Sequence, residues 1–239
     1  MSRALLTVRD LFAGYERGSE TLHGMTLEVR DGQVVSIIGP NGAGKSTVLR
    51  AIFGMLPWRK GHVDFQGQSV LGLRSHEMLS AGMAFIAQGQ NIFPELSVSR
   101  NLELGAYVRK DRAAIRTDLD AVYHKYPALV PLRGKPAGLL SGGQIRMLEI
   151  ARALLVRPTL ILVDEPSLGL SPLMSTQVFR DLKGLREEGI GILLVEQNAE
   201  ASLRMSDYAY VVEGGRNGPH GPAERIRTDE AVRRNYLGA

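Results

Sequence analysis

The chain has 239 residues, enough to bury a substantial core, as one domain or as a domain with a subdomain. Its 29 basic and 25 acidic residues leave a formal charge of +4, an excess too small to indicate a nucleic-acid-binding arm, and we expect no nucleic acid among its partners. The absence of cysteine excludes disulfides and cysteine-ligated metals.

No apolar run approaches the roughly 20 residues that a membrane helix needs. The first eight residues lead straight into Arg9 and Asp10, without the apolar centre of a signal peptide. We therefore expect the chain to remain in the cytosol and to reach a membrane only through a partner.

Short apolar runs separated by turns fill the chain up to residue 38. Runs at residues 5–8, 22–29 and 34–38 predict strands, and residues 13–18, which carry the aromatic Tyr15, predict a loop. The last run is apolar enough for a buried parallel strand.

The next stretch, residues 39–47, matches the phosphate-binding pattern G-x-x-x-x-G-K-[ST]. It lies between the run at 34–38 and a predicted helix that ends at Gly54, which is the strand–turn–helix context that the pattern requires. Backbone N–H groups in such a turn and the helix dipole both favour phosphate. A turn that binds nothing is the alternative. We predict a nucleoside triphosphate site made of Gly39, Pro40, Asn41, Gly42, Ala43, Gly44, Lys45, Ser46 and Thr47.

A change of pattern after residue 88 predicts a helical insertion. Before it, residues 61–67 predict a hairpin strand with its turn, and residues 83–87 predict a buried strand. Residues 89–140 instead show helices with one polar face. A further helix is predicted directly after Ser141, Gly142 and Gly143, with its end marked by Pro158. The prolines that interrupt the insertion are Pro94, Pro127, Pro131 and Pro136.

The remaining residues alternate between strands and helices. Strands are predicted at 160–163, 190–195 and 208–212, with a helix over about 175–187 between the first two. This alternation is typical of a parallel sheet with crossover helices. After a turn at residues 214–215 only a mostly polar tail is predicted.

Two consecutive carboxylates follow the apolar residues 160–163. Ligands of open α/β sheets bind outside the carboxyl ends of the strands, so Asp164 and Glu165 should emerge beside Lys45. Asp164 is suited to holding Mg²⁺ together with Ser46, and Glu165 is then placed to orient or deprotonate an attacking water. A solvated acidic pair is the alternative, but beside a phosphate-binding loop the pair indicates hydrolysis.

A third motif, at residues 140–144, lies just before the helix predicted to end at Pro158. Ser141 can cap this helix, and bare backbone N–H groups at Gly142 and Gly143 can receive an anion. Taken alone, the motif is only a capped helix start. Taken with the other two motifs, Leu140, Ser141, Gly142, Gly143 and Gln144 resemble the signature motif of ATP-binding cassette ATPases.

The resemblance implies a P-loop NTPase fold of the α/β class, with a mainly parallel core sheet, an antiparallel β subdomain and an inserted helical subdomain. Within one domain, 1–239, it assigns about 1–88 and 156–213 to the nucleotide-binding core with its β subdomain, about 89–155 to the helical subdomain, and 214–239 to a C-terminal tail. In this family the signature motif of one subunit binds the γ-phosphate of ATP held by a second. A head-to-tail dimer enclosing ATP and Mg²⁺ is therefore expected.

Tyr15 and Gln88 acquire roles only through this resemblance. Tyr15 matches the aromatic that stacks on adenine, although alone it would be a surface or packing tyrosine. Gln88 matches the glutamine that contacts Mg²⁺ and the water. The neighbouring Gln90 leaves that assignment open, because a loop glutamine is usually only solvated.

Two positions depart from the family pattern. Ser171 stands where members usually have an aspartate, in the loop that crosses the dimer interface. Gln197 stands where most have a histidine that contacts the γ-phosphate, and none of the five histidines lies near it in sequence. Glutamine can donate a hydrogen bond but carries no positive charge. We expect Gln197 to sense the γ-phosphate by hydrogen bonding alone, with Glu165 as the base.

Four segments narrow the resemblance to LivF-type ATPase subunits of branched-chain amino acid importers; they are residues 92–98, 164–172, 195–198 and 236–238. This resemblance implies integral membrane permease subunits, which dock on the segment after Gln88. It also implies a second ATPase subunit, which is either an identical copy or a sister protein, and, indirectly, a solute-binding protein. The chain would be peripheral on the inner face of the cell membrane. Residues 217–220 lack the apolar strand character of relatives, so the pairing of the tail is not predicted.

Three other functions remain open from the sequence. The chain could energise transport of another solute, such as urea or amides. It could be a non-transport cassette acting on ribosomes or DNA, although these commonly carry two cassettes, long coiled coils or metal-binding cysteines. It could also be a switch that binds ATP without hydrolysing it, which the intact pair Asp164 and Glu165 disfavours.

Overall fold

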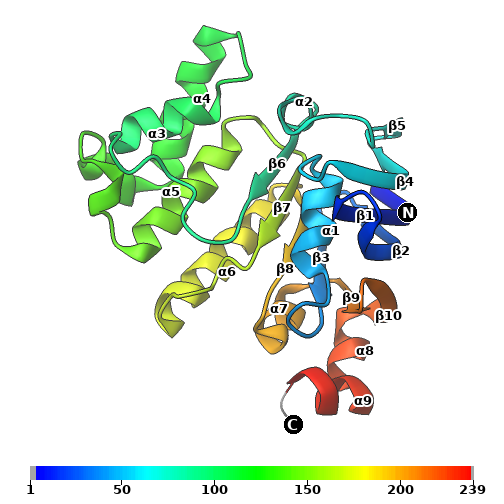
Figure 1. Ribbon diagram of the computed structural model, residues 1–239. Helices are drawn as coiled ribbons and strands as arrows, with labels where there is room; N and C mark the ends of the chain where they lie inside the picture. The colour runs from blue at the N-terminus through cyan, green and yellow to red at the C-terminus, as the bar shows by residue number, and fades with distance from the viewer. Residues whose placement is uncertain (1–3, 238–239) are drawn as a thin grey trace.

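The computed structural model describes residues 4–237, which form two β-sheets and the helices around them (Figure 1). The strands are β1 (Ala4–Glu16), β2 (Ser19–Arg30), β3 (Val34–Ile38), β4 (Trp58–Phe65), β5 (Gln68–Ser69), β6 (Met83–Ile86), β7 (Leu160–Asp164), β8 (Gly191–Val195), β9 (Tyr208–Glu213) and β10 (Arg216–Pro222). The helices are α1 (Lys45–Ile52), α2 (Ser75–Ser80), α3 (Val98–Gly105), α4 (Arg112–Lys125), α5 (Gly142–Leu154), α6 (Pro172–Glu187), α7 (Ala199–Met205), α8 (Ala223–Thr228) and α9 (Glu230–Val232). Segments of 3-10 helix are η1 (Pro127–Leu132) and η2 (Ala137–Leu139), and η3 (Arg233–Leu237) is a π-helical segment.

The core sheet has the strand order β10-β9-β3-β8-β7-β6. All its pairings are parallel except that of β10 with β9, so the prediction of a mainly parallel sheet is confirmed. Strands β3, β7 and β8 are buried throughout, because other elements cover both faces of the sheet. Successive side chains point to opposite faces: Leu193 packs in a core shared with α1 and β1, and Leu194 in one shared with α3, α5 and α6.

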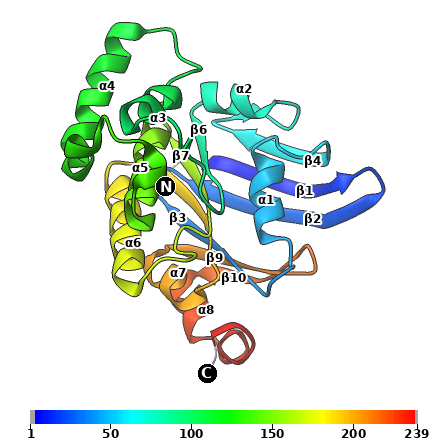
Figure 2. The same cartoon turned by 60° about the vertical axis from the view of Figure 1, so that its left-hand side comes forward.

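The second sheet is antiparallel, in the order β2-β1-β4-β5. It lies on one side of the core sheet, whereas α3, α4 and α5 lie on the other side, as both views show (Figures 1 and 2). Helix α1 packs with both sheets in a single hydrophobic core. Residues 4–237 contain no helix that is long and apolar enough to cross a membrane.

Tyr15 lies on a strand, so the loop predicted at residues 13–18 is wrong. Strand β1 continues to Glu16, and its pairing with β2 reaches Glu16 opposite Ser19 at the tip of the hairpin. Gly18, with a φ of 89°, makes the tight turn. The apolar periodicity stops early because the outer part of this hairpin is exposed to solvent.

The chain after Gly215 begins with a strand, where the sequence pattern predicts only a mostly polar tail. Strand β10 pairs antiparallel with β9, with an irregularity between Asn217 and His220. The Asn217 side chain accepts a hydrogen bond from the Thr26 N–H (2.7 Å) and donates one to the Thr26 carbonyl (2.9 Å). The side-chain amide of Asn217 therefore bonds to the β2 backbone as a peptide unit would. At this point the two sheets are connected by polar contacts.

Candidate functional site

A polar cavity of about 500 Å³, here named the nucleotide cavity, lies where four parallel strands of the core sheet end. Residues after β3, β6, β7 and β8 line it. It brings together the predicted residues Lys45, Ser46, Gln88, Glu165 and Gln197, together with Asn41, Gly42, Gly44 and Thr47 of the phosphate-binding loop. The ends of these parallel strands thus bring together side chains that are far apart in sequence.

The phosphate-binding loop owes its shape to glycine. Gly44, with a φ of 100°, precedes α1 and supplies no side chain to cap it, so the first N–H groups of α1 stay available for an anion. A Cβ on Gly39 would lie 2.2 Å from the Val212 carbonyl of β9. Only glycine lets the loop leave β3 this close to the neighbouring strand.

Lys45 is 5% exposed, and its ammonium donates to the carbonyls of Gly39 (2.9 Å) and Pro40 (3.0 Å) in its own loop. Burial lowers the pKa of Lys45, and the nearby Glu165 and Asp164 carboxylates oppose that change. The ammonium is thus held above the loop by neutral acceptors that phosphate oxygens can replace.

Ser46 and Asp164 meet as predicted. The Ser46 hydroxyl donates to Oδ1 of Asp164 at 2.7 Å, while Oδ2 is buried and has no hydrogen-bond partner. Burial raises the pKa of Asp164. A buried carboxylate oxygen without a partner beside a hydroxyl fits a hard divalent cation such as Mg²⁺. Residues 4–237 hold no cluster of three or more His, Cys, Asp or Glu suited to a metal, so phosphate oxygens and water would have to complete the coordination.

Glu165 and Gln88 are in direct contact. Glu165 follows β7 with a φ of 46°, an uncommon conformation for a residue with a side chain. Its N–H donates to the Val195 carbonyl, and its Oε2 accepts a hydrogen bond from the Gln88 amide at 2.8 Å. Gln90 lines a different cavity, so geometry places Gln88 alone of the two glutamines at the nucleotide cavity.

Gln197 lines the nucleotide cavity, and no histidine does. The residue before it, Glu196, was missed by the sequence analysis although it also directly follows a buried strand. Glu196 is 2% exposed and accepts hydrogen bonds from the N–H groups of Ser167, Gln197 and Asn198. It therefore joins the loop after Glu165 to the loop that carries Gln197. Ser171 caps α6 by accepting from the Met174 N–H.

The signature segment, residues 140–144, does not line the nucleotide cavity of its own chain. Ser141 caps α5, and Gln144 bonds back to the Ser141 N–H at 2.9 Å, which forms a capping box. A Cβ on Gly143 would lie 2.2 Å from the Met174 sulfur, so α6 packs closely on this turn. Beside it, Leu139 and Leu173 are 65% and 75% exposed.

Tyr15 lies beside the loop but does not line the nucleotide cavity. It is 49% exposed, its hydroxyl lies 3.5 Å from the Thr47 hydroxyl, and it accepts a hydrogen bond from Arg50 at 3.1 Å. The ring is therefore accessible at the edge of the site, as stacking on a base requires.

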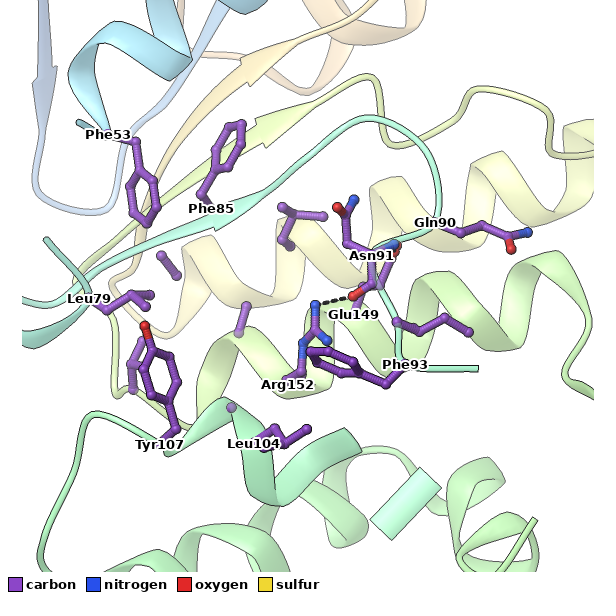
Figure 3. A pocket seen from close by; sticks show the side chains of 16 residues that line it. Phe53, Leu79, Phe85, Gln90, Asn91, Phe93, Leu104, Tyr107, Glu149 and Arg152 are labelled. Atoms are coloured by element: carbon purple, nitrogen blue, oxygen red, sulfur yellow. Dashed lines mark hydrogen bonds between the residues drawn. The ribbon is translucent and has the colours of Figure 1, made fainter. Parts of the chain in front are cut away.

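A second cavity of about 730 Å³, here named the apolar cavity, lies between the core sheet and the helices of the insertion (Figure 3). Phe53 and Phe85 stack at its wall with ring centroids 5.3 Å apart. Phe93 and Tyr107 also line it and are 51% and 62% exposed. Sequence patterns did not predict this cavity, because it depends on how α3 and α5 pack beside β6.

The fold and the site together define a P-loop nucleotide-binding protein. The family model described as "ABC transporter" matches residues 22–168. The chain therefore belongs to the ABC transporter family, and it is an ATP-binding cassette ATPase.

Similar proteins extend over the whole chain. It is 38% identical to the high-affinity branched-chain amino acid transport ATP-binding protein BraG of Pseudomonas aeruginosa, over 96% of this chain and 98% of BraG. It is 34% identical to a probable branched-chain amino acid transport ATP-binding protein LivF of Archaeoglobus fulgidus and to the lipopolysaccharide export system ATP-binding protein LptB of Escherichia coli, over 98% of each chain. The crystal structure of an ABC transporter ATP-binding cassette in its ADP conformation superposes with a TM-score of 0.87 at 27% identity, covering both chains completely.

Proposed function

We propose that the chain hydrolyses ATP to drive the uptake of branched-chain amino acids through membrane subunits. The observation that carries the hydrolytic part is the Ser46–Asp164 pair with a buried, unpartnered carboxylate oxygen, next to the Gln88–Glu165 pair. The choice of solute rests on the similarity to BraG and LivF over nearly the whole chain.

In the proposed mechanism, Lys45 exchanges its two carbonyl partners for oxygens of the β- and γ-phosphates, and the N–H groups at the start of α1 add further donors. Ser46, Asp164 and Gln88 would hold Mg²⁺, which neutralises charge on the phosphates when bound. Glu165 orients the attacking water and accepts its proton, while the Gln88 amide fixes one carboxylate oxygen. Gln197 donates a hydrogen bond to the γ-phosphate.

A second ATPase subunit would complete the site. The signature segment lies outside the nucleotide cavity of its own chain, which supports an arrangement in which its N–H groups face a phosphate carried by the other subunit. The exposed Leu139 and Leu173 beside it would then be covered. In this arrangement Tyr15 stacks on adenine at the outer edge of each site, and Ser171, which caps α6, offers a hydroxyl where relatives usually have a carboxylate.

The apolar cavity is the proposed docking place of a membrane permease subunit. Its exposed aromatic residues Phe93 and Tyr107 follow the segment that leads from Gln88 into the insertion, and they supply the apolar anchors that interfaces use. The chain would thus be peripheral on the inner face of the membrane, and a solute-binding protein would act on the complex from the other side.

Reconstituted transport tests the proposal. The chain is combined with the permease and solute-binding subunits of a branched-chain amino acid importer, and Mg²⁺-dependent phosphate release and uptake of labelled leucine, urea and amides are measured in parallel. Leucine uptake that Lys45→Ala abolishes supports the proposal. Hydrolysis coupled to urea or amide uptake, or stimulated by lipopolysaccharide as the similarity to LptB would suggest, refutes the assignment of branched-chain amino acids as the solute. Absence of phosphate release refutes the hydrolytic part.

A further inference from the structure

Asn91 lies at the centre of a set of hydrogen bonds in the segment after Gln88. Its side-chain amide donates to the carbonyls of Ala87 (3.0 Å) and Gln88 (3.4 Å). These bonds fold the chain after β6 back on itself and restrict the direction of the backbone at Gln88.

Helix α5 holds the backbone of the same residue from the other side. The Asn91 N–H donates to Oε1 of Glu149, and the Arg152 guanidinium donates to the Asn91 carbonyl. Glu149 is 3% exposed, and its other oxygen forms an ion pair with Arg146 at 2.8 Å. We call Asn91, Glu149 and Arg152 the Asn91 clamp. The buried Glu149 carboxylate and the Arg152 guanidinium thus both form hydrogen bonds with the main chain of one loop residue.

The clamp joins two parts of the candidate site. Helix α5 begins at Gly142, inside the signature segment, so a displacement of α5 would be transmitted through the clamp to Gln88. Gln88 in turn bonds to Glu165. All three clamp residues also line the apolar cavity, where Figure 3 shows them close together, so an occupant of that cavity would touch the clamp directly.

We propose that Asn91 is a positioning residue for hydrolysis: held by Glu149 and Arg152, it fixes Gln88 against Glu165 and makes the signature helix and Gln88 move together. This inference rests on the proposed ATP hydrolysis. It goes beyond that function because it assigns the coupling between the signature helix and Gln88 to three residues that do not line the nucleotide cavity.

The test compares Asn91→Ala with Gln88→Ala and with the double variant in the purified full-length chain. Asn91 is exposed, so the substitution should leave the fold intact. We expect kcat to fall about fivefold, the effect of losing about one hydrogen bond, while the KM for ATP stays unchanged. Because Asn91 acts through Gln88, the double variant should have the kcat of Gln88→Ala alone.

Asn217→Ala is the matched control, because its amide also bonds to two backbone groups but lies between β10 and β2, away from both cavities. It should keep the parent kcat. Additive losses in the double variant, or an equal fall of kcat in Asn217→Ala, would overturn the proposal. Hydrogen exchange gives a readout without catalysis: Asn91→Ala should speed amide exchange across residues 87–91 at unchanged melting temperature. Asn91→Ala removes the side-chain bonds to Ala87 and Gln88 and keeps the main-chain bonds to Glu149 and Arg152. If the parent hydrolyses no ATP but this exchange rises, the hydrolytic proposal fails and the positioning of residues 87–91 by the Asn91 side chain stands; unchanged exchange refutes that positioning.

Discussion

The nucleotide cavity and the apolar cavity lie on either side of residues 88–91, and they are built in opposite ways. At the nucleotide cavity, polar side chains already have partners within the chain: Lys45 donates to two loop carbonyls, and Ser46 donates to Asp164. The apolar cavity instead exposes the rings of Phe93 and Tyr107. The first is preorganised as the proposed chemistry requires, whereas the second exposes apolar surface that the proposed partner would cover.

Replacing Glu165, the proposed base, should cause the largest loss of ATP hydrolysis. Glu165→Gln keeps the shape of the side chain and an acceptor for Gln88 but removes the proton acceptor, so kcat should fall about 10²- to 10⁴-fold. Binding of ATP should persist, and an ATP-bound dimer should accumulate. Phosphate release and size-exclusion chromatography with ATP measure the two effects.

Glu187→Gln, on the exposed surface at the end of α6, is the matched control for this charge loss and should behave like the parent. Unimpaired turnover by Glu165→Gln would show that another group accepts the proton.

The Gln197 substitution probes the same cavity with a smaller expected effect. Gln197→Ala should lower kcat about tenfold, because a hydrogen bond to a charged phosphate contributes more than a neutral one. Single-turnover hydrolysis with saturating Mg²⁺ and ATP checks this, with the exposed Gln68→Ala of β5 as control. A variant as fast as the parent would remove Gln197 from the mechanism.

The two cavities also differ in how far sequence could predict them. The phosphate-binding loop, Asp164 and Glu165 are local patterns, and the rule that ligands bind at the ends of parallel strands is enough to bring them together. Glu149 and Asn91 carry no local pattern, since their contact depends on how α5 packs beside the loop after β6. Glu149 did leave a signal, a carboxylate among the buried residues of a helix, but that signal does not name its partner.

The expected occupant of the apolar cavity can be tested with Phe93→Asp. A carboxylate in place of a half-exposed ring removes an apolar anchor and adds a charge that docking would desolvate. The affinity for the membrane subunits should fall about fivefold or more, measured by titration of the detergent-solubilised permease. Binding of a fluorescent ATP analogue by the same variant reports whether the fold is intact. Undiminished affinity would place the docking surface elsewhere.

The smallest expected effect is a change in stability when Asp164 is replaced. Its buried oxygen has no hydrogen-bond partner, which lowers the stability of the empty site. Asp164→Asn keeps an acceptor for Ser46 but removes a buried charge, so without Mg²⁺ and nucleotide it should raise the free energy of unfolding by about 1 kcal/mol. The melting temperature in EDTA should then rise by about 2–4 °C, whereas the exposed Asp120→Asn should leave it unchanged. Addition of Mg²⁺ and ATP should stabilise the parent more than Asp164→Asn, because only the parent keeps the carboxylate for the cation. A lower melting temperature of Asp164→Asn in EDTA would show that the carboxylate stabilises the empty site, and that the strain in the nucleotide cavity lies elsewhere, for example at the positive φ of Glu165.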